Sequence, residues 1–174
     1  MHAETERLVL RSFTAEDLPG FTALITNVMA GPYAAYGDPF PTDEAGLREL
    51  LCFLAGTEQF FAVTLRDDGR LIGMFSLNET GREGERNFGF CLHSAYHHHG
   101  YAREAGRALI QYAAETPGLD HLISFTAKLN VPAVALLQAL GFVITGETDD
   151  VSFACDEQGQ RIRYVSCTCM KQLI

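Results

Sequence analysis

The stretch ERNFGFCLHSAYHHHGYAREAGRALIQYAAE, residues 85–115, decides the fold because its hydrophobic period changes partway along. Residues 85–93 have the apolar, β-prone pattern of a strand. From residue 100 onward, small and apolar residues recur on one helical face, at Ala102, Ala105, Gly106, Leu109, Ile110 and Ala113. A strand therefore runs through a short loop into a helix, which we expect to end around 116–118.

The junction between this strand and this helix is a candidate anion site. The first amides of a helix have no acceptor within the helix, and the helix dipole makes that end positive. Gly100 lets a phosphate approach the backbone without a Cβ in the way, and Ala102 keeps the first turn narrow. Histidines 97–99 cannot all face one ion from a regular element, and no Cys or Glu lies at ligand spacing, so we expect no metal.

The rest of the chain predicts a mixed sheet. We expect strands at 7–13, on both sides of a hairpin turn at 67–69 within 60–79, at 85–93, at 121–127, at 142–148 and after a turn at 156–159. Helices are expected at 14–29, with an irregular start at Pro19-Gly20, at 42–54, from 100, and at 130–142 between Asn130 and Gly141 as caps. Antiparallel strands followed by one βαβ crossover indicate an α+β (mixed α/β) fold in a single domain, 1–174.

Composition narrows the function classes. A chain of 174 residues with 47% hydrophobic and 20% charged residues is typical of one globular domain. Its apolar runs fall far short of the roughly 20 residues that span a bilayer, and its first residues lack the apolar segment of a secretory signal, so we expect a cytoplasmic protein with no membrane partner.

The five cysteines form no CxxC pair and are expected to be reduced. A net charge of −9 argues against nucleic acid and favours a cationic partner.

Three segments together resemble the GNAT acetyltransferase superfamily, and in particular its RimJ/RimL-like branch, which acetylates protein N-termini. They are HHHGYAREAGRALIQYAAE, NVPAVALLQALGFVITGE and, near the start, TERLVLRSF. Residues 97–102 fall on the superfamily's Gln/Arg-x-x-Gly-x-Gly/Ala pyrophosphate loop, NFGFCLH resembles the preceding strand, and Asn130 and Gly141-Phe142 match a later motif. The resemblance implies a central, mostly antiparallel sheet of about seven strands, helices on both faces, and a cleft where strands 85–93 and 121–127 splay apart.

The resemblance also implies acetyl-CoA, or another acyl-CoA, as co-substrate. Its pyrophosphate would bind the amides of 98–102, its pantetheine arm would follow the strand, and a backbone N–H at Cys91 or Leu92 would stabilise the oxyanion. The implied cofactor-binding residues are Phe90, Cys91, Leu92, His93, His97, His98, His99, Gly100, Tyr101, Ala102 and Asn130. Tyr33 and Tyr36, in a long loop at 30–41, are candidate substrate contacts.

Several positions depart from the family pattern. His97 and His98 replace the usual loop residues, Leu137 stands where many members have a tyrosine acid, and Ala133 stands where the branch has a serine. Asn87 replaces a frequent acidic residue. The candidate base is therefore Glu79, with Asn87 orienting a water or the amine, although a solvated strand-end carboxylate explains Glu79 equally well.

The activity implied is direct acetyl transfer to a primary amine, foremost a protein N-terminal α-amino group and alternatively a small amine such as an antibiotic or polyamine. The rival interpretation is a non-catalytic acyl-CoA-binding module, because Leu137, Ala133 and Asn87 cannot act as acid or base. We expect a monomer or homodimer.

Overall fold

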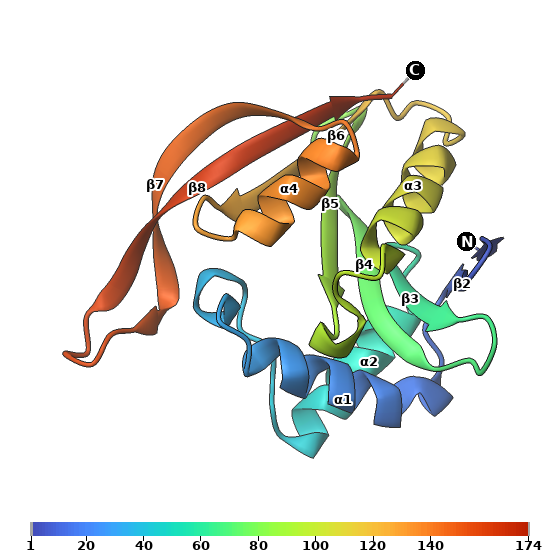
Figure 1. Ribbon diagram of the computed structural model, residues 1–174, viewed down its shortest axis with the longest axis horizontal. Coiled ribbons are helices and arrows are strands. Elements are labelled where there is room, and N and C mark those ends of the chain that lie inside the picture. The colour runs from blue at the N-terminus through green and yellow to red at the C-terminus, as the bar shows by residue number, and fades with distance from the viewer. Residues whose placement is uncertain (1, 174) are drawn as a thin grey trace.

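The computed structural model describes residues 2–173 and contains an open eight-stranded sheet in the order β1-β2-β3-β4-β5-β6-β8-β7 (Figure 1). The strands are β1 (His2–Glu4), β2 (Leu8–Arg11), β3 (Phe60–Leu65), β4 (Leu71–Glu79), β5 (Glu85–Leu92), β6 (His121–Ala127), β7 (Val143–Cys155) and β8 (Arg161–Gln172). The helices are α1 (Leu18–Met29), α2 (Glu44–Ala55), α3 (Tyr101–Ala114) and α4 (Val131–Ala139), with short 3₁₀ turns at Ala15–Asp17, Ala34–Tyr36 and Ser94–Tyr96. No described helix is both long and apolar enough to cross a membrane.

The helices pack on both faces of the sheet because successive residues of a strand point to opposite faces, and the central strands β3 and β4 are buried at most positions. On one face, α3 and α4 contribute Ala105, Leu109 and Leu137 to a core that includes Phe75 and Phe88 of the central strands. On the other face, α1 and α2 bury a second set of apolar residues, among them Phe21, Ile25, Leu47 and Leu51, against Ala62 and Met74. The predicted two-sided covering of a mixed sheet is thus confirmed.

The β5–α3–β6 crossover contains the feature that positions the site. The strands β5 and β6 are parallel, but their pairing covers only Glu85–Asn87 against His121–Ile123, while all other described strand pairs are antiparallel. Beyond Asn87 the two strands diverge, and β5 continues away from β6 toward α1 (Figure 1). The expected splay between these strands is therefore present, and it leaves residues 88–92 without a partner strand on that side.

The expected element order is confirmed with local differences. The strand expected at 7–13 is shorter, and His2–Glu4 adds an eighth strand by pairing with it. The irregular helix start is a 3₁₀ turn at Ala15–Asp17, followed by α1 with Pro19 in its first turn. Asn130 does cap α4, its side-chain oxygen accepting a hydrogen bond from the Ala133 amide (3.2 Å), and Gly141 follows the helix with φ 87°.

The last two strands form a longer hairpin than the sequence predicts. Strand β7 extends to Cys155 rather than ending near 148, and its paired ladder with β8 projects from the body of the sheet (Figure 1). The hairpin contacts the 30–41 loop, where the Ser152 hydroxyl donates to the Ala35 carbonyl and the Tyr36 and Tyr164 rings meet edge to face at 5.3 Å. The loop between α1 and α2 is therefore attached to the hairpin.

Candidate active site

The loop before α3 has an unusual backbone. His98 has φ 62°, and no other non-glycine residue among 2–173 has a positive φ. Gly100, two residues later, has φ 83° and forms the N-cap of α3. The first intrahelical bond runs from the Glu104 amide to the Gly100 carbonyl (3.0 Å), so the amides of residues 101–103 precede it. A backbone turned twice through the left-handed region before a helix N-terminus is suited to binding an anion.

Two of the three consecutive histidines, His97 and His99, contact the backbone of the loop or of the strand before it. The His97 Nε2 lies 2.9 Å from the Leu92 carbonyl oxygen, and the His99 Nδ1 lies 2.6 Å from the His97 carbonyl oxygen. Just before the loop, His93 Nδ1 accepts a hydrogen bond from the Ala95 amide (3.2 Å). Within the described chain, no three or more His, Cys, Asp or Glu side chains are arranged to hold a metal ion.

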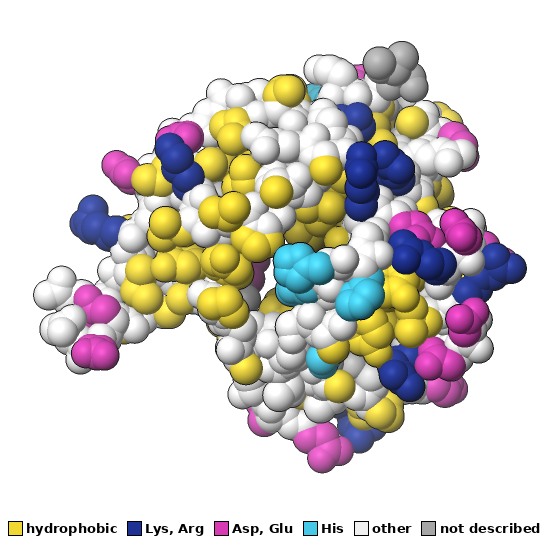
Figure 2. All heavy atoms as spheres, in the orientation of Figure 1, with side chains coloured by type: hydrophobic (Ala, Val, Ile, Leu, Met, Phe, Trp, Pro, Cys, Tyr) yellow, Lys and Arg dark blue, Asp and Glu magenta, His cyan; other side chains and the backbone are white. Residues whose placement is uncertain are grey.

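The loop borders a hollow on one face of the molecule. Figure 2 shows histidine side chains at the rim of this hollow and several Lys or Arg side chains beside them, over α3. The residues from His97 to Gly100 are all exposed, and Tyr101 and Ala102 are half-buried. The loop backbone is therefore accessible to a ligand from solvent.

The unpaired edge of β5 presents main-chain groups to the splay. The His93 amide donates to the Ile72 carbonyl of β4 (2.9 Å), and β4 and β5 keep one register from Gly73–Leu92 to Glu79–Arg86. Main-chain groups alternate in direction along an antiparallel strand, so the amide of Cys91 points toward β4. Those of Phe90 and Leu92 point toward the splay. The sequence suggested the backbone amide of Cys91 or Leu92 as oxyanion donor, and of these two only the Leu92 amide points into the splay.

The candidate base Glu79 and its helper Asn87 lie on opposite faces of the sheet. The Glu79 side chain at the end of β4 is 67% exposed and lies 3.7 Å from Arg86, with which it is paired in register. Asn87 is half-buried opposite Asn78, on the face toward α1 and α2. The structure does not bring the Glu79 and Asn87 side chains together, because successive residues of a strand alternate between faces.

The Cys91 thiol is not activated. Burial raises the pKa of Cys91 to about 12, despite a hydrogen bond with the Met74 backbone that acts in the opposite direction. A thiol with this pKa is protonated at neutral pH and is a poor nucleophile. The arrangement favours direct transfer over a cysteine intermediate.

The remaining sequence-based candidates have structural contacts of their own. The Asn130 side chain caps α4, Tyr36 packs on Tyr164 of the hairpin, and Tyr33 lies half-buried in the same loop. Leu137 is fully buried in the core beside α3, where a polar group would have no access to solvent.

Sequence reasoning missed a polar cluster formed by Thr5, Arg7 and Glu104. In the sequence, Glu104 only continues the loop motif, and its partners lie almost a hundred residues earlier in the chain. No local pattern pairs residues at such a separation. The cluster lines a groove of about 640 Å³ between the N-terminal segment and α3.

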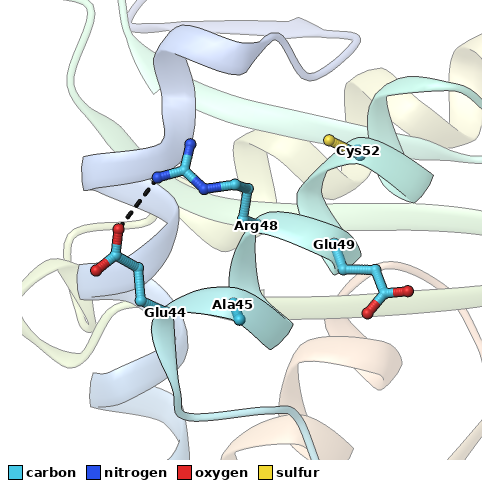
Figure 3. Close-up of a pocket in the computed structure, with 5 residues that line it drawn as sticks. All are labelled: Glu44, Ala45, Arg48, Glu49 and Cys52. Atoms are coloured by element: carbon cyan, nitrogen blue, oxygen red, sulfur yellow. Dashed lines mark hydrogen bonds and ion pairs between the residues drawn. The ribbon is translucent and has the colours of Figure 1, made fainter.

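A second hollow, of about 600 Å³, lies on the exposed face of α2 (Figure 3). It is lined by Glu44, Ala45, Arg48, Glu49 and Cys52, and the Arg48 guanidinium donates to Glu44 (3.1 Å) one helical turn away. This hollow is shallow, and it belongs to the helix layer opposite α3. It is separate from the loop and the splay.

Comparison with known proteins agrees with this geometry. Residues 7–143 match the family model described as an acetyltransferase (GNAT) domain. The uncharacterized N-acetyltransferase YnaD of Bacillus subtilis is 25% identical over 141 residues, which cover 81% of this chain and 82% of that protein.

Solved structures share the fold over nearly the whole chain. The ribosomal-protein-S5-alanine acetyltransferase from Vibrio fischeri superposes with a TM-score of 0.82 at 18% identity, covering 99% of this chain and 97% of its own. The spermidine N-acetyltransferase from Vibrio cholerae, solved with CoA and spermine, superposes with a TM-score of 0.78 at 22% identity, covering 97% of each chain.

Proposed function

The chain belongs to the GNAT acetyltransferases and is an acyl-CoA-dependent N-acetyltransferase, and from this premise we propose that it transfers acetyl groups from acetyl-CoA to protein N-terminal α-amino groups. The observation that carries the proposal is the junction of β5 and α3. There, a left-handed loop, the free amides of a helix N-terminus and the unpaired edge of β5 lie consecutively in the chain.

The residues of this junction fit the chemical groups of CoA. The amides of residues 98–102 suit a pyrophosphate, because the helix end is positive and Gly100 leaves the backbone uncovered. The edge of β5 offers the main-chain groups of Phe90 and Leu92, which point into the splay and can pair with the amides of pantetheine, whereas the amides of Cys91 and His93 point toward β4. When bound, acetyl-CoA supplies an activated acyl thioester.

In the proposed reaction the chain mainly positions the two substrates and contributes few polar side chains. The Leu92 amide, directed into the splay, is the proposed oxyanion donor. Asn87, on the face toward α1 and α2, is the proposed residue for orienting the acceptor amine. Glu79 pairs in register with Arg86, six residues along β5 from Leu92, and lies on the opposite face, so it does not act together with Asn87, and the amine proton is proposed to leave to water. Positioning alone can account for several kcal/mol of barrier reduction, so a site with few acid–base groups is physically reasonable.

Two observations bear on the acceptor. The Vibrio fischeri structure is named for acetylation of a ribosomal-protein alanine, which supports a protein N-terminus. A net charge of −9 and the named spermidine acetyltransferase support a second candidate, a small polycation such as a polyamine. The two candidates differ in the charge and size of the acceptor.

Calorimetry with acetyl-CoA, combined with an assay for released CoA thiol, tests the proposal. The acceptor panel contains peptides beginning with Ala or Ser, the same peptides with blocked α-amino groups, and spermidine. We expect thiol release with the free peptides and none with the blocked ones. Release with spermidine alone would favour the second candidate. Tight binding without acceptor-dependent release would instead indicate a non-catalytic acyl-CoA-binding module.

A further inference from the structure

One carboxylate holds the N-terminal segment against the first turn of α3. Glu104 Oε1 accepts hydrogen bonds from the Thr5 hydroxyl (2.6 Å) and the Arg7 amide (2.9 Å). Glu104 Oε2 accepts a hydrogen bond from Arg7 Nε (2.8 Å) and forms an ion pair with Arg7 Nη2 at 2.6 Å. Two side chains and one main-chain amide thus converge on a single residue that follows Gly100 by four positions.

The Arg7 guanidinium also contacts the loop itself. Its Nη1 donates to the His99 carbonyl (3.0 Å), and its carbon lies 4.5 Å from the centre of the Tyr101 ring. A Cβ built on Gly100 would lie 3.4 Å from Nη2. One planar cation therefore contacts His99 and Tyr101, on either side of Gly100, where the backbone turns from the left-handed region into the helix.

The cluster has the geometry of a strong ion pair. The Glu104 side chain is only 18% exposed, against 42% for Arg7. Partial burial acts to raise the pKa of Glu104, but the hydrogen bonds from Thr5 and Arg7 outweigh it and hold the pKa below its ordinary value. A fork-shaped, charge-assisted contact of this kind fixes direction as well as distance.

We propose that Arg7 and Glu104 are positioning residues for CoA, holding His99, Gly100 and Tyr101 so that the amides at the start of α3 are arranged for the pyrophosphate before it binds. This inference rests on the proposed CoA site. Arg7 acts through the His99 carbonyl and the Tyr101 ring, and Glu104 acts through Arg7. Preorganisation of this kind lowers the cost of ordering the loop on binding, so its loss weakens affinity for CoA more than it slows transfer once CoA is bound.

The test compares Arg7→Ala, Arg7→Lys and Glu104→Gln in the full chain, with Arg48→Ala as matched control. Arg48 forms an Arg–Glu pair of the same type on α2, exposed and away from the loop. We expect Arg7→Ala to raise the Kd for CoA and the KM for acetyl-CoA about tenfold. The kcat at saturating acetyl-CoA and the KM for the acceptor should stay within about twofold.

The other variants separate positioning from general damage. Lysine keeps the charge but cannot contact Glu104 and His99 as a planar fork, so Arg7→Lys should recover part of the affinity. Glu104→Gln should raise the Kd for CoA about as much as Arg7→Ala does. The double variant should raise it little further, because the two residues take part in the same interaction. Arg48→Ala should match the wild-type protein in every constant.

Each outcome of this comparison is decisive. If the wild-type protein binds CoA and Arg7→Ala binds it within about twofold, the positioning role is wrong while the CoA site stands. Additive losses for Arg7→Ala and Glu104→Gln, or equal losses in kcat and both KM values, would also overturn it, because they indicate independent or global effects. If the wild-type protein itself binds no CoA, the proposed function fails first. Far-UV circular dichroism and thermal unfolding test whether each variant is folded. If Arg7→Ala does not fold, Arg7→Lys takes its place in the comparison of CoA affinities.

Discussion

At the scale of single residues, Gly100 is the position where the sequence and the backbone agree most directly. Its φ of 83° is a conformation that side chains with a branched Cβ rarely adopt. Among the described residues, the nearest atom to a Cβ placed on Gly100 would be the Arg7 Nη2, at 3.4 Å, which is ordinary contact. The need for glycine is thus conformational rather than steric. A substitution should distort the loop without disturbing the core.

Gly100→Val is therefore expected to weaken CoA binding by at least about tenfold, because the strained loop turns its amides away from the pyrophosphate. Gly118→Val is the matched control, since Gly118 has φ 77°, lies after α3, and would bring an added Cβ within 4 Å of none of its described neighbours. Both variants should lose similar stability. Equal CoA affinity in titration calorimetry for the two variants would contradict the pyrophosphate assignment.

Sequence reasoning at this scale found the residues of the loop but not their support. Gly100, His97 and Asn130 were identifiable from local pattern, because caps and left-handed positions are encoded by neighbours in the chain. The pairing of Arg7 with Glu104, and the placement of Glu79 and Asn87 on opposite sheet faces, depend on three-dimensional contact and strand register. Neither of these two features is indicated by neighbouring residues in the sequence.

At the scale of elements, the first helix depends on an ion pair at its start. Arg11, at the end of β2, donates to both carboxylate oxygens of Asp17 (2.7 Å each), and the Thr14 amide adds a third bond (2.8 Å). Burial acts to raise the pKa of Asp17, but the bonds from Arg11 and Thr14 outweigh it, and the pKa lies below the ordinary value. The pair joins strand and helix.

Asp17→Asn should therefore lower the free energy of unfolding by about 2 kcal/mol at neutral pH. Because the pKa is lower in the folded state, the stabilisation is complete above the unfolded-state pKa of about 3.9 and is lost as the pH falls through the folded-state pKa. The difference between wild type and variant should thus shrink below about pH 4. Urea unfolding at several pH values measures it. A difference that is constant with pH would show that the charge of Asp17 is not responsible.

The splay of β5 predicts an alternating pattern of amide protection. Phe90 and Leu92 direct their amides away from β4 and lie beyond the last pair with β6, whereas Gly89 and Cys91 direct theirs toward β4. Hydrogen exchange followed by NMR should show faster exchange at Phe90 and Leu92 than at Gly89 and Cys91. Added CoA should slow exchange at Phe90 or Leu92. Protection of all four amides without CoA would mean that another group already pairs with the edge.

At the scale of the whole molecule, the order of strands and helices was predictable because periodicity is local. The added strand at His2–Glu4 and the extension of β7 to Cys155 were not, since both exist by pairing with a neighbouring strand rather than by their own composition. The part that was not predicted, residues 149–155, begins with Asp149 and Asp150 and is mostly exposed, so its composition gives little indication of a strand. The added length of β7 is formed by pairing with β8.

The net charge of −9 also acts at this scale and distinguishes the two candidate acceptors. A negative field attracts cations in proportion to their charge, and salt screens it as the Debye length falls from about 30 Å at 0.01 M to about 10 Å at 0.1 M. Raising the salt over this range should therefore increase the KM for spermidine more than that for a peptide with one positive charge. The KM for anionic acetyl-CoA should not increase in the same way. Steady-state assays at the two salt concentrations measure all three values, and identical salt dependence for spermidine and the peptide would show that local contacts, not the overall field, govern capture of the amine.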